Sequence, residues 1–391
     1  MKKNSREMRM RQLYRRIRIG IVVLVTVLVV LLLIVNALKS GRGKTEETAS
    51  TGTASAEAAP DAAAAGENEI SGETVLSPEA EGGTAASEAM PEKISIKVSA
   101  VGDCTLGTDD SFDYDTSFNA AFYDADYPGW FLENCQDYFG DDDLTIVNFE
   151  GVLSKRGERE DKTYAFRGDP EFVKVLTEGS VEAANLANNH AFDYGTDAYE
   201  DTKEILTDAG ITNFGYDRSM VIDVKGVKVG LTGTLALYDE RDAKDGMVEQ
   251  IKWCHDQGAQ LIISSIHWGD EGQYYQADWQ EYLGRAAVDA GADLVIGHHP
   301  HRLQPYEIYN GKVILYSLGN FCFGGNRVPS DMDSAIYQQT FTFENGELTP
   351  DLDYRIVPCS ISSASGYNNY QPTPLYGDDA DRVKAKIAKI S

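Results

Sequence analysis

The sequence predicts a layered α/β fold, because apolar strand-like runs alternate with helical patterns through most of its 391 residues. Several of the helical patterns end at a glycine, the residue that commonly follows the last helical turn. Several of the strand-like runs end at a histidine, an asparagine or a carboxylate. Since functional groups in such folds gather where the strands end, the same pattern predicts a polar site at a sheet edge.

The predicted elements begin at residue 94 and continue to the C-terminus. Alternating apolar and polar residues predict the first strand, and Pro170, Gly210, Gly258 and Gly291 mark helix ends. Strands are expected at 94–101, 144–149, 181–186, 228–232, 261–266, 292–296 and 313–318, with antiparallel strands at 335–358. Helices are expected at 169–178, 199–209, 246–257 and 279–290, with a short surface helix at 376–391.

The N-terminal part predicts a membrane anchor and a tether. Residues 19–38 are almost entirely apolar, which is long enough for one transmembrane helix, and the basic segment 1–18 precedes them. The positive-inside rule then places the N-terminus in the cytoplasm and the rest of the chain outside, at the cell membrane. A cleaved signal peptide is the alternative, disfavoured by the length of the run and the lack of a clear cleavage site. Residues 39–93 predict a disordered linker, 94–360 the folded domain and 361–391 a C-terminal tail.

The charge of the chain disfavours nucleic acid as a partner. The net charge is −27, although the first forty residues carry nine Lys or Arg and a single Glu, so the remainder is more acidic still. Binding to phosphate backbones requires clustered Lys and Arg. The five cysteines have no Cys-x-x-Cys spacing, and we infer neither a disulfide framework nor a cysteine-ligated zinc.

Histidines at strand ends predict a metal site. His299 and His301 follow the strand-like run at 292–296, His267 ends the run at 261–266, and His190 follows the run at 181–186. A lone histidine at such a place is usually a satisfied polar group, but three clusters of this kind together favour metal binding. His255 falls within a predicted helix, and we leave it out of the site.

Oxygen ligands follow other strand ends. Asp103 comes after the first strand, Glu150 after the second, and Asn189 directly precedes His190. One Asp, one Glu, one Asn and three His form a mixed oxygen and nitrogen set, which suits one or two Mn, Fe or Zn ions better than Ca or Mg. Two such ions sharing a carboxylate can activate water, so hydrolysis is the predicted reaction class.

The motifs resemble, in order, those of the CapA family, the capsule-synthesis or poly-γ-glutamate-biosynthesis proteins within the calcineurin-like metallophosphoesterases. The resemblance covers roughly residues 94–325. It rests on Gly102-Asp103-x-x-Leu106-Gly107, Asn148-Phe149-Glu150-Gly151, Tyr164-Ala165-Phe166-Arg167, Asn188-Asn189-His190-Ala191-Phe192-Asp193-Tyr194-Gly195, His267-Trp268-Gly269-Asp270-Glu271, Gly297-His298-His299-Pro300-His301 and Tyr316-Ser317-Leu318-Gly319-Asn320-Phe321.

The resemblance implies a four-layered α/β/β/α sandwich with the metal centre at the sheet edges. It implies that His190 donates a proton to the leaving group and that Asp193 orients it. Thr105 stands where this superfamily usually has a histidine, which removes one ligand from one metal. The implied ligands are Asp103, Glu150, Asn189, His267, His299 and His301, with Glu150 bridging, and the expected substrate contacts are Arg167, His298 and Trp268.

Three functions are compatible with these residues. The first is a membrane-anchored, extracytoplasmic metal-dependent hydrolase that acts on poly-γ-glutamate or a related anionic surface polymer. The second is a non-catalytic component that binds the polymer beside a capsule synthase and export membrane proteins, which Thr105 favours. The third is a surface phosphodiesterase, which the superfamily favours and the acidic composition disfavours.

Overall fold

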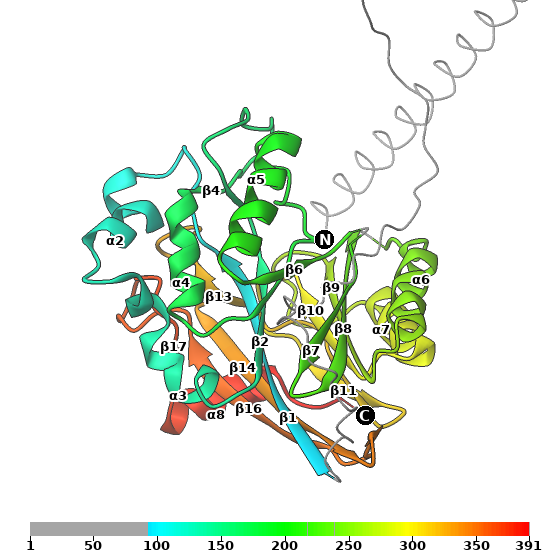
Figure 1. Ribbon diagram of the computed structural model, residues 1–391. Coiled ribbons are helices and arrows are strands. Elements are labelled where there is room, and N and C mark those ends of the chain that lie inside the picture. Colours follow the sequence, from blue (N-terminus) through cyan, green and yellow to red (C-terminus); the bar gives the residue numbers. More distant parts are fainter. Residues whose placement is uncertain (1–92, 217, 238, 391) are drawn as a thin grey trace, which may run out of the picture. The chain divides into compact units, whose positions relative to one another are not determined.

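A computed structural model describes residues 93–216, 218–237 and 239–390, and two β-sheets form the centre of this region (Figure 1). In the first sheet the order is β17-β16-β14-β1-β2-β5-β6, with β13 beside β1 and β15 beside β14. The neighbours β1, β2, β5 and β6 are parallel, so their carboxyl ends meet at one edge. The strands are β1 (Lys93–Thr105), β2 (Leu144–Phe149), β5 (Ala183–Asn185), β6 (Thr212–Phe214), β13 (Asn320–Phe323), β14 (Asp333–Glu344), β15 (Glu347–Leu348), β16 (Asp353–Ser360) and β17 (Thr373–Pro374).

The second sheet has the order β11-β12-β10-β9-β8-β7. Its four inner strands are parallel, and antiparallel β7 and β11 form the edges. The register pairs His298 of β10 with His267 of β9, which brings two of the predicted site histidines to the same level. The strands are β7 (Met220–Val224), β8 (Val227–Leu237), β9 (Leu261–Gly269), β10 (Leu294–His298), β11 (Tyr306–Tyr309) and β12 (Lys312–Leu315), and a separate pair is formed by β3 (Val152–Leu153) and β4 (Arg167–Gly168).

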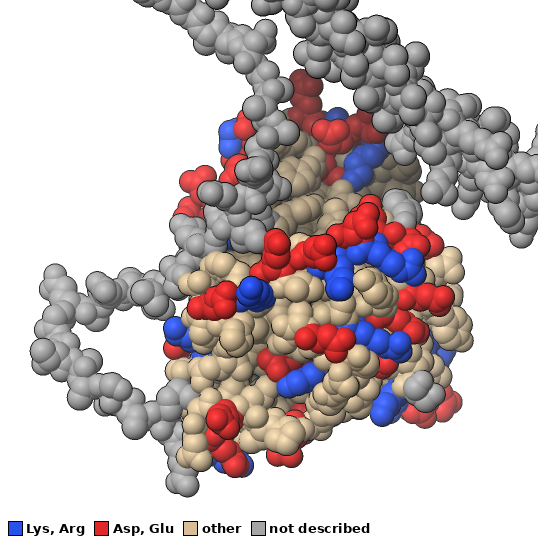
Figure 2. Space-filling model, turned by 90° about the vertical axis from the view of Figure 1, so that its right-hand side faces the viewer, with Lys and Arg blue, Asp and Glu red and all other residues tan. Residues whose placement is uncertain are grey.

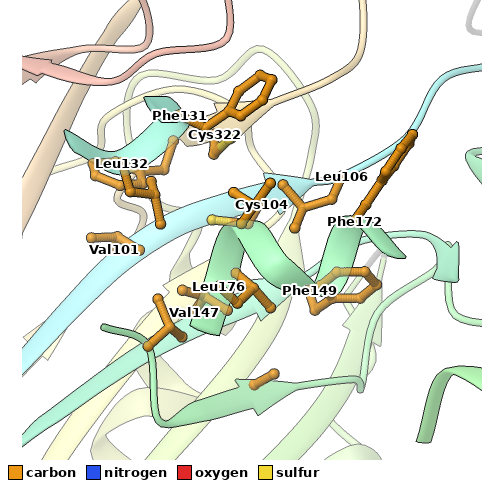
Figure 3. Close-up of a cluster of buried hydrophobic side chains, with 14 of the residues drawn as sticks. Val101, Cys104, Leu106, Phe131, Leu132, Val147, Phe149, Phe172, Leu176 and Cys322 are labelled. Atoms are coloured by element: carbon orange, nitrogen blue, oxygen red, sulfur yellow. The ribbon is translucent and has the colours of Figure 1, made fainter. Parts of the chain in front are cut away.

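Helices cover the outer faces of the two sheets, and three clusters of buried apolar side chains join the layers. One cluster lies between the first sheet and its helices, and Figure 3 shows its Phe, Leu, Val and Cys side chains meeting there. A second cluster joins the two sheets, and a third joins the second sheet to α6 and α7. The predicted α/β class is confirmed. The helices are α2 (Phe118–Asp124), α3 (Gln136–Phe139), α4 (Lys174–Thr177), α5 (Gly195–Asp208), α6 (Ala243–Asp256), α7 (Asp278–Ala290) and α8 (Gly377–Lys386), with 3₁₀ turns η1 (Tyr114–Thr116), η2 (Pro128–Cys135) and η3 (Pro170–Val173).

Helix α7 illustrates how the sequence sets an element. Leu283 and Ala287 lie four residues apart and are fully buried, so one face of the helix packs on the second sheet. The helix ends before Gly291, whose φ of 116° is a conformation that a residue with a side chain rarely adopts. The predicted helix at 279–290 is therefore confirmed to within one residue.

The structure differs from the predicted elements mainly in short segments. The region between β1 and β2 contains η1, α2, η2 and α3, none of which was predicted, because each is too short to show a helical period. The predicted helix at 169–178 is divided into η3 and α4. The predicted tail packs against the domain, since β17 pairs with β16 and the side chains of Tyr370, Val383 and Ile387 are buried.

No helix within the described residues has both the length and the apolar character needed to cross a bilayer. The predicted basic segment, transmembrane helix and linker, residues 1–92, lie outside the described residues. The anchor and the extracytoplasmic location therefore stay predictions.

The surface that carries α7 mixes both signs of charge. Figure 2 shows Lys and Arg atoms lying beside Asp and Glu on this face. Arg285 of α7 contacts Glu307 with 2.9 Å between Nη2 and Oε1, and Lys312 contacts Asp293 with 2.7 Å between Nζ and Oδ1. Basic side chains paired in this way leave little uncompensated positive charge on this face for a phosphate backbone.

Glu182, directly before β5, predicts a pH dependence of stability. Burial raises the pKa of Glu182 from 4.5 to about 7, so the folded chain keeps a proton that the unfolded chain has released. The free energy of unfolding therefore falls as the pH rises through this window. We expect Glu182→Gln to make that slope shallower, by on the order of 1 kcal/mol across the window because the group is partly exposed. The amide oxygen can still accept the Thr145 N–H, now 2.7 Å from the carboxylate.

Urea denaturation at several pH values between these two pKa values measures the slope. Glu347→Gln, at an exposed position on β15, is the matched control and should leave the slope unchanged. An unaltered slope in Glu182→Gln would show that Glu182 does not hold the proton.

Candidate metal centre

The six predicted ligands come together where the carboxyl ends of both sheets meet. Asp103 lies near the end of β1, Glu150 directly after β2, and Asn189 in the turn that follows β5. The three histidines come from the second sheet: one lies near the end of β9 and two lie in the turn after β10. Four of the six are buried, namely Asp103, Glu150, His267 and His299, while Asn189 and His301 are partly exposed.

One group of donor atoms comprises Asp103, Glu150 and His301. One ligand atom from each of the three lies within 4.8 Å of the others. The Nδ1 of His301 is 3.1 Å from Oδ2 of Asp103, and its Nε2 is 3.9 Å from Oε1 of Glu150. The Nδ1 is also 2.9 Å from Oδ1 of Asn320, a contact that orients the ring and leaves Nε2 facing Glu150.

The second group comprises Asn189, His267 and His299, again next to Glu150. The Nε2 of His267 is 2.8 Å from Oδ1 of Asn189 and 3.9 Å from Oε1 of Glu150. The rings of His267 and His299 are 4.7 Å apart between centroids. The Oε1 of Glu150 therefore lies 3.9 Å from a histidine of each group, which is compatible with the predicted sharing of its carboxylate by two ions.

The protonation and hydrogen bonding of these residues fit a divalent ion. Both carboxylate oxygens of Glu150 are buried and have no hydrogen-bond partner among the described residues, and the same holds for Nδ1 of His299. Burial raises the pKa of Glu150 to about 8 and lowers that of His299 to about 3, so the imidazole is neutral, as a ligand must be. A buried carboxylate without a partner is costly, and a bound cation removes that cost. Mixed nitrogen and oxygen donors suit Mn, Fe or Zn.

The backbone is strained where it presents two of the histidines. His299 has φ of 95° and His301 has φ of 52°, in a region that residues with side chains seldom occupy. Each costs about 1–3 kcal/mol and persists only if the surroundings enforce it. The backbone N–H of His299 donates to Oδ2 of Asp103 at 3.3 Å, which ties the strained turn to the end of β1.

Asn148 supports the site, although the sequence analysis gave it no role. Its Nδ2 donates to Oδ1 of Asp103 at 2.9 Å and lies 3.2 Å from Nδ1 of His267, while Asn185 donates to its Oδ1 at 2.9 Å. The signal was present in the sequence: Asn148 lies two residues before Glu150 on the same strand end, and strand residues two apart face the same side.

His190 and Asp193 lie side by side, next to the predicted metal ligands. The Nδ1 of His190 is 2.7 Å from Oδ2 of Asp193, and its Nε2 points toward Oε1 of Glu150 at 3.7 Å. Burial lowers the pKa of His190. Lys162, which the sequence analysis did not assign, donates to Oδ1 of Asp193 at 2.6 Å and to the carbonyl of Asn189 at 2.8 Å. Lys162 lies in a loop, where no periodic pattern marks a residue as part of a site.

The three predicted substrate contacts occupy different environments. Arg167 lies 3.5 Å from the ring centroid of Tyr194 and donates to the carbonyls of Arg156 and Gly157. His298 is buried, with Nδ1 3.4 Å from Oδ1 of Asp103. Trp268 is fully buried in the cluster beneath α7, and its Nε1 donates to the Tyr316 carbonyl at 2.8 Å. Trp268 therefore lies in the core behind the site. It is a strand residue, because β9 continues to Gly269.

The Lys162–Asp193 pair predicts a stability effect. The Asp193 side chain is fully buried, so Lys162→Met leaves its charge without a cation and should lower the free energy of unfolding by about 2 kcal/mol. Urea denaturation measures the loss. Lys174→Met is the control, since Lys174 makes an exposed pair within one turn of chain, and it should change stability by less than about 0.5 kcal/mol. The double variant combines Lys162→Met with Asp193→Asn. If its loss in free energy of unfolding equals the sum of the losses in the two single variants, the two side chains do not stabilise each other.

Comparison with known sequences identifies the family of this chain. The family described as "Bacterial capsule synthesis protein PGA_cap" matches residues 97–325, which is more than half of the chain and includes all six predicted ligands. The chain belongs to this family. The predicted resemblance to the CapA proteins is thereby confirmed.

Two relatives of this capsule synthesis family come from Bacillus. The chain is 31% identical over 296 residues to "Capsule biosynthesis protein CapA" of Bacillus anthracis, covering 68% of each chain. It is 33% identical over 254 residues to "PGA biosynthesis protein CapA" of Bacillus subtilis, covering 57% of this chain and 65% of that protein. Among solved structures, "calcineurin-like phosphoesterase YfkN" of Bacillus subtilis aligns over 75% of this chain at 17% identity, with a TM-score of 0.42.

Proposed function

We propose that this protein is a membrane-anchored, extracytoplasmic, metal-dependent hydrolase that acts on poly-γ-glutamate or a related anionic surface polymer. Membership of the capsule synthesis family supports the biological setting. The chemistry rests on one observation: a fully buried carboxylate, Glu150, without hydrogen-bond partners among the described residues, lies beside a histidine from each of two groups of candidate metal donors. A site that only stabilised the fold would have no need of an unpaired buried carboxylate.

The residues divide into ion binding, proton transfer and positioning. Asp103, Glu150 and His301 would hold one ion, and Glu150 with Asn189, His267 and His299 would hold the other. Such ions, when bound, act as Lewis acids that polarise the reacting carbonyl or phosphoryl group and lower the pKa of water. His190, with its Nε2 toward Glu150 and its Nδ1 held by Asp193, is placed to give a proton to the leaving group. Lys162 orients Asp193 and adds a positive charge near the site.

The polymer would be drawn to the site locally, because the chain as a whole is acidic. Lys162 is partly exposed and contacts the Asn189 carbonyl, and His301 is also partly exposed. Capsule synthase and export membrane proteins are the partners we propose, held near by the membrane anchor predicted for residues 19–38.

A non-catalytic role in polymer binding is the second candidate, and Thr105 favours it. Its hydroxyl is buried and without a partner among the described residues, at the position where the superfamily usually supplies an imidazole. An ion that lacks a ligand there would bind polymer carboxylates more readily than it would activate water.

Incubation of the full-length chain with poly-γ-glutamate distinguishes these proposals. With Mn²⁺ present, a hydrolase shortens the polymer, and a chelator stops the shortening. Unchanged chain length with metal bound would contradict the hydrolase and favour the binding role. Cleavage of an aryl phosphodiester, without any shortening of the polymer, would instead identify a phosphodiesterase.

A further inference from the structure

The loop between β9 and α7 brings a seventh donor to the metal centre. Glu271 lies in this loop, two residues after Gly269, and its side chain is exposed. One ligand atom each from Glu271, His299 and His301 lies within 4.8 Å of the other two. Glu271 belongs to the motif His267-Trp268-Gly269-Asp270-Glu271, and no role was predicted for it.

The backbone holds Glu271 at this place. The N–H of the next residue, Gly272, donates to the carbonyl of Pro300 at 2.8 Å. Pro300 lies between the two strained histidines, so the loop is tied to the turn that presents them. Glu271 is therefore held beside this turn, and its exposed side chain approaches the centre from the solvent side.

A count of donors shows what Glu271 adds. The ion held by Glu150, Asn189, His267 and His299 has four protein ligands. The ion held by Asp103, Glu150 and His301 has three, and Thr105 offers it no imidazole. His301 belongs to both three-residue groups, so Glu271 lies beside a ligand of this ion, while the third member of its group, His299, belongs to the neighbouring ion.

Two independent observations indicate that a cation belongs here. The Nδ1 of His299, a residue 1% exposed, has no partner among the described residues, and neither do the oxygens of fully buried Glu150. Glu271 has a ligand atom within 4.8 Å of ligand atoms of His299 and His301, a separation at which the residues can share an ion.

We propose that Glu271 is the fourth protein ligand of the ion held by Asp103, Glu150 and His301, closing the centre from the solvent side. This inference rests on the metal centre of the proposed function but does not depend on its reaction. The loop carboxylate gives this ion a ligand that β1, with Thr105, does not supply.

Metal binding tests the proposal separately from activity. The full-length chain is freed of metal with a chelator and titrated with Mn²⁺, and the free ion is counted by its paramagnetic resonance signal. We expect the wild type to bind two ions, and Glu271→Gln to bind one as before and the other at least tenfold more weakly. Asp270→Asn, the adjacent exposed carboxylate, is the matched control and should bind as the wild type does.

The outcomes separate this proposal from the proposed function. Unchanged binding of both ions by Glu271→Gln would overturn the role of Glu271, and so would a wild-type chain that binds no metal. Selective loss of one ion would support it even if poly-γ-glutamate is never shortened, because the readout does not involve hydrolysis.

Discussion

His190→Ala is expected to reduce turnover of the polymer by about 10²- to 10⁴-fold while leaving metal content and folding unchanged. The imidazole Nε2 is 3.7 Å from Glu150, close enough to the ions to serve a leaving group bound there. Its other nitrogen is held by Asp193, so the ring is oriented before substrate binds. Removing it takes away the proton donor but none of the six proposed ligands. Polymer length and bound Mn²⁺ are measured on the same preparations.

His255→Ala is the matched control for this experiment. His255 is an exposed histidine on α6 and lies in none of the groups of donor atoms described above. The control should hydrolyse polymer as the wild type does. If His190→Ala loses metal in proportion to activity, His190 is a ligand and the assigned proton-transfer role is wrong.

Glu150→Gln should have the second large effect, on metal binding. Glu150 is next to both groups of donors, and the substitution replaces its charged carboxylate by a neutral amide of almost the same size. We expect loss of at least one ion and weakening of the other. Mn²⁺ stabilises the wild type by about 2.7 kcal/mol at a concentration a hundred times its dissociation constant, and Glu150→Gln should lose most of this gain.

In the metal-free protein, Glu150→Gln should have the opposite effect on the free energy of unfolding. Burial raises the pKa of Glu150 from 4.5 to about 8, so between these values the folded chain keeps a proton that the unfolded chain has released, and the free energy of unfolding falls as the pH rises. Glu150→Gln removes that loss, so at high pH the metal-free variant should be at least as stable as the metal-free wild type. Thermal unfolding with and without Mn²⁺ measures both effects.

Glu249→Gln, at an exposed position on α6, is the matched control. It should change neither the stabilisation by Mn²⁺ nor the stability of the metal-free protein. A Glu150→Gln variant that binds two ions with wild-type affinity would contradict the shared carboxylate.

The sequence predicted the parts of the site that strand ends determine. Asp103, Glu150, His267 and His299 follow long apolar runs, and parallel strands bring such ends to one edge. Lys162 and Glu271 were not assigned because they lie in loops, where the path of the chain depends on tertiary contacts. The hydrogen bond from Gly272 to Pro300, which holds one of these loops, leaves no pattern in the sequence.

The burial of individual side chains was also predicted incompletely from the sequence. Trp268 follows His267 directly and was expected to contact substrate, but adjacent strand residues face opposite sides, and its ring lies in the core. The first strand was predicted at 94–101, whereas β1 extends to Thr105, so Asp103 lies within the strand rather than after it. The helices between β1 and β2 were missed because each spans only one or two turns.

The most direct test of the central claim, a metal centre built around Glu150, is a crystal structure of the protein soaked in Mn²⁺, with the ions located by anomalous scattering. We expect one or two peaks within roughly 2 to 2.5 Å of the Glu150 carboxylate and of imidazole nitrogens of His267, His299 or His301. Fully occupied Mn²⁺ peaks elsewhere on the domain, with no peak beside Glu150, would contradict a metal centre at this place.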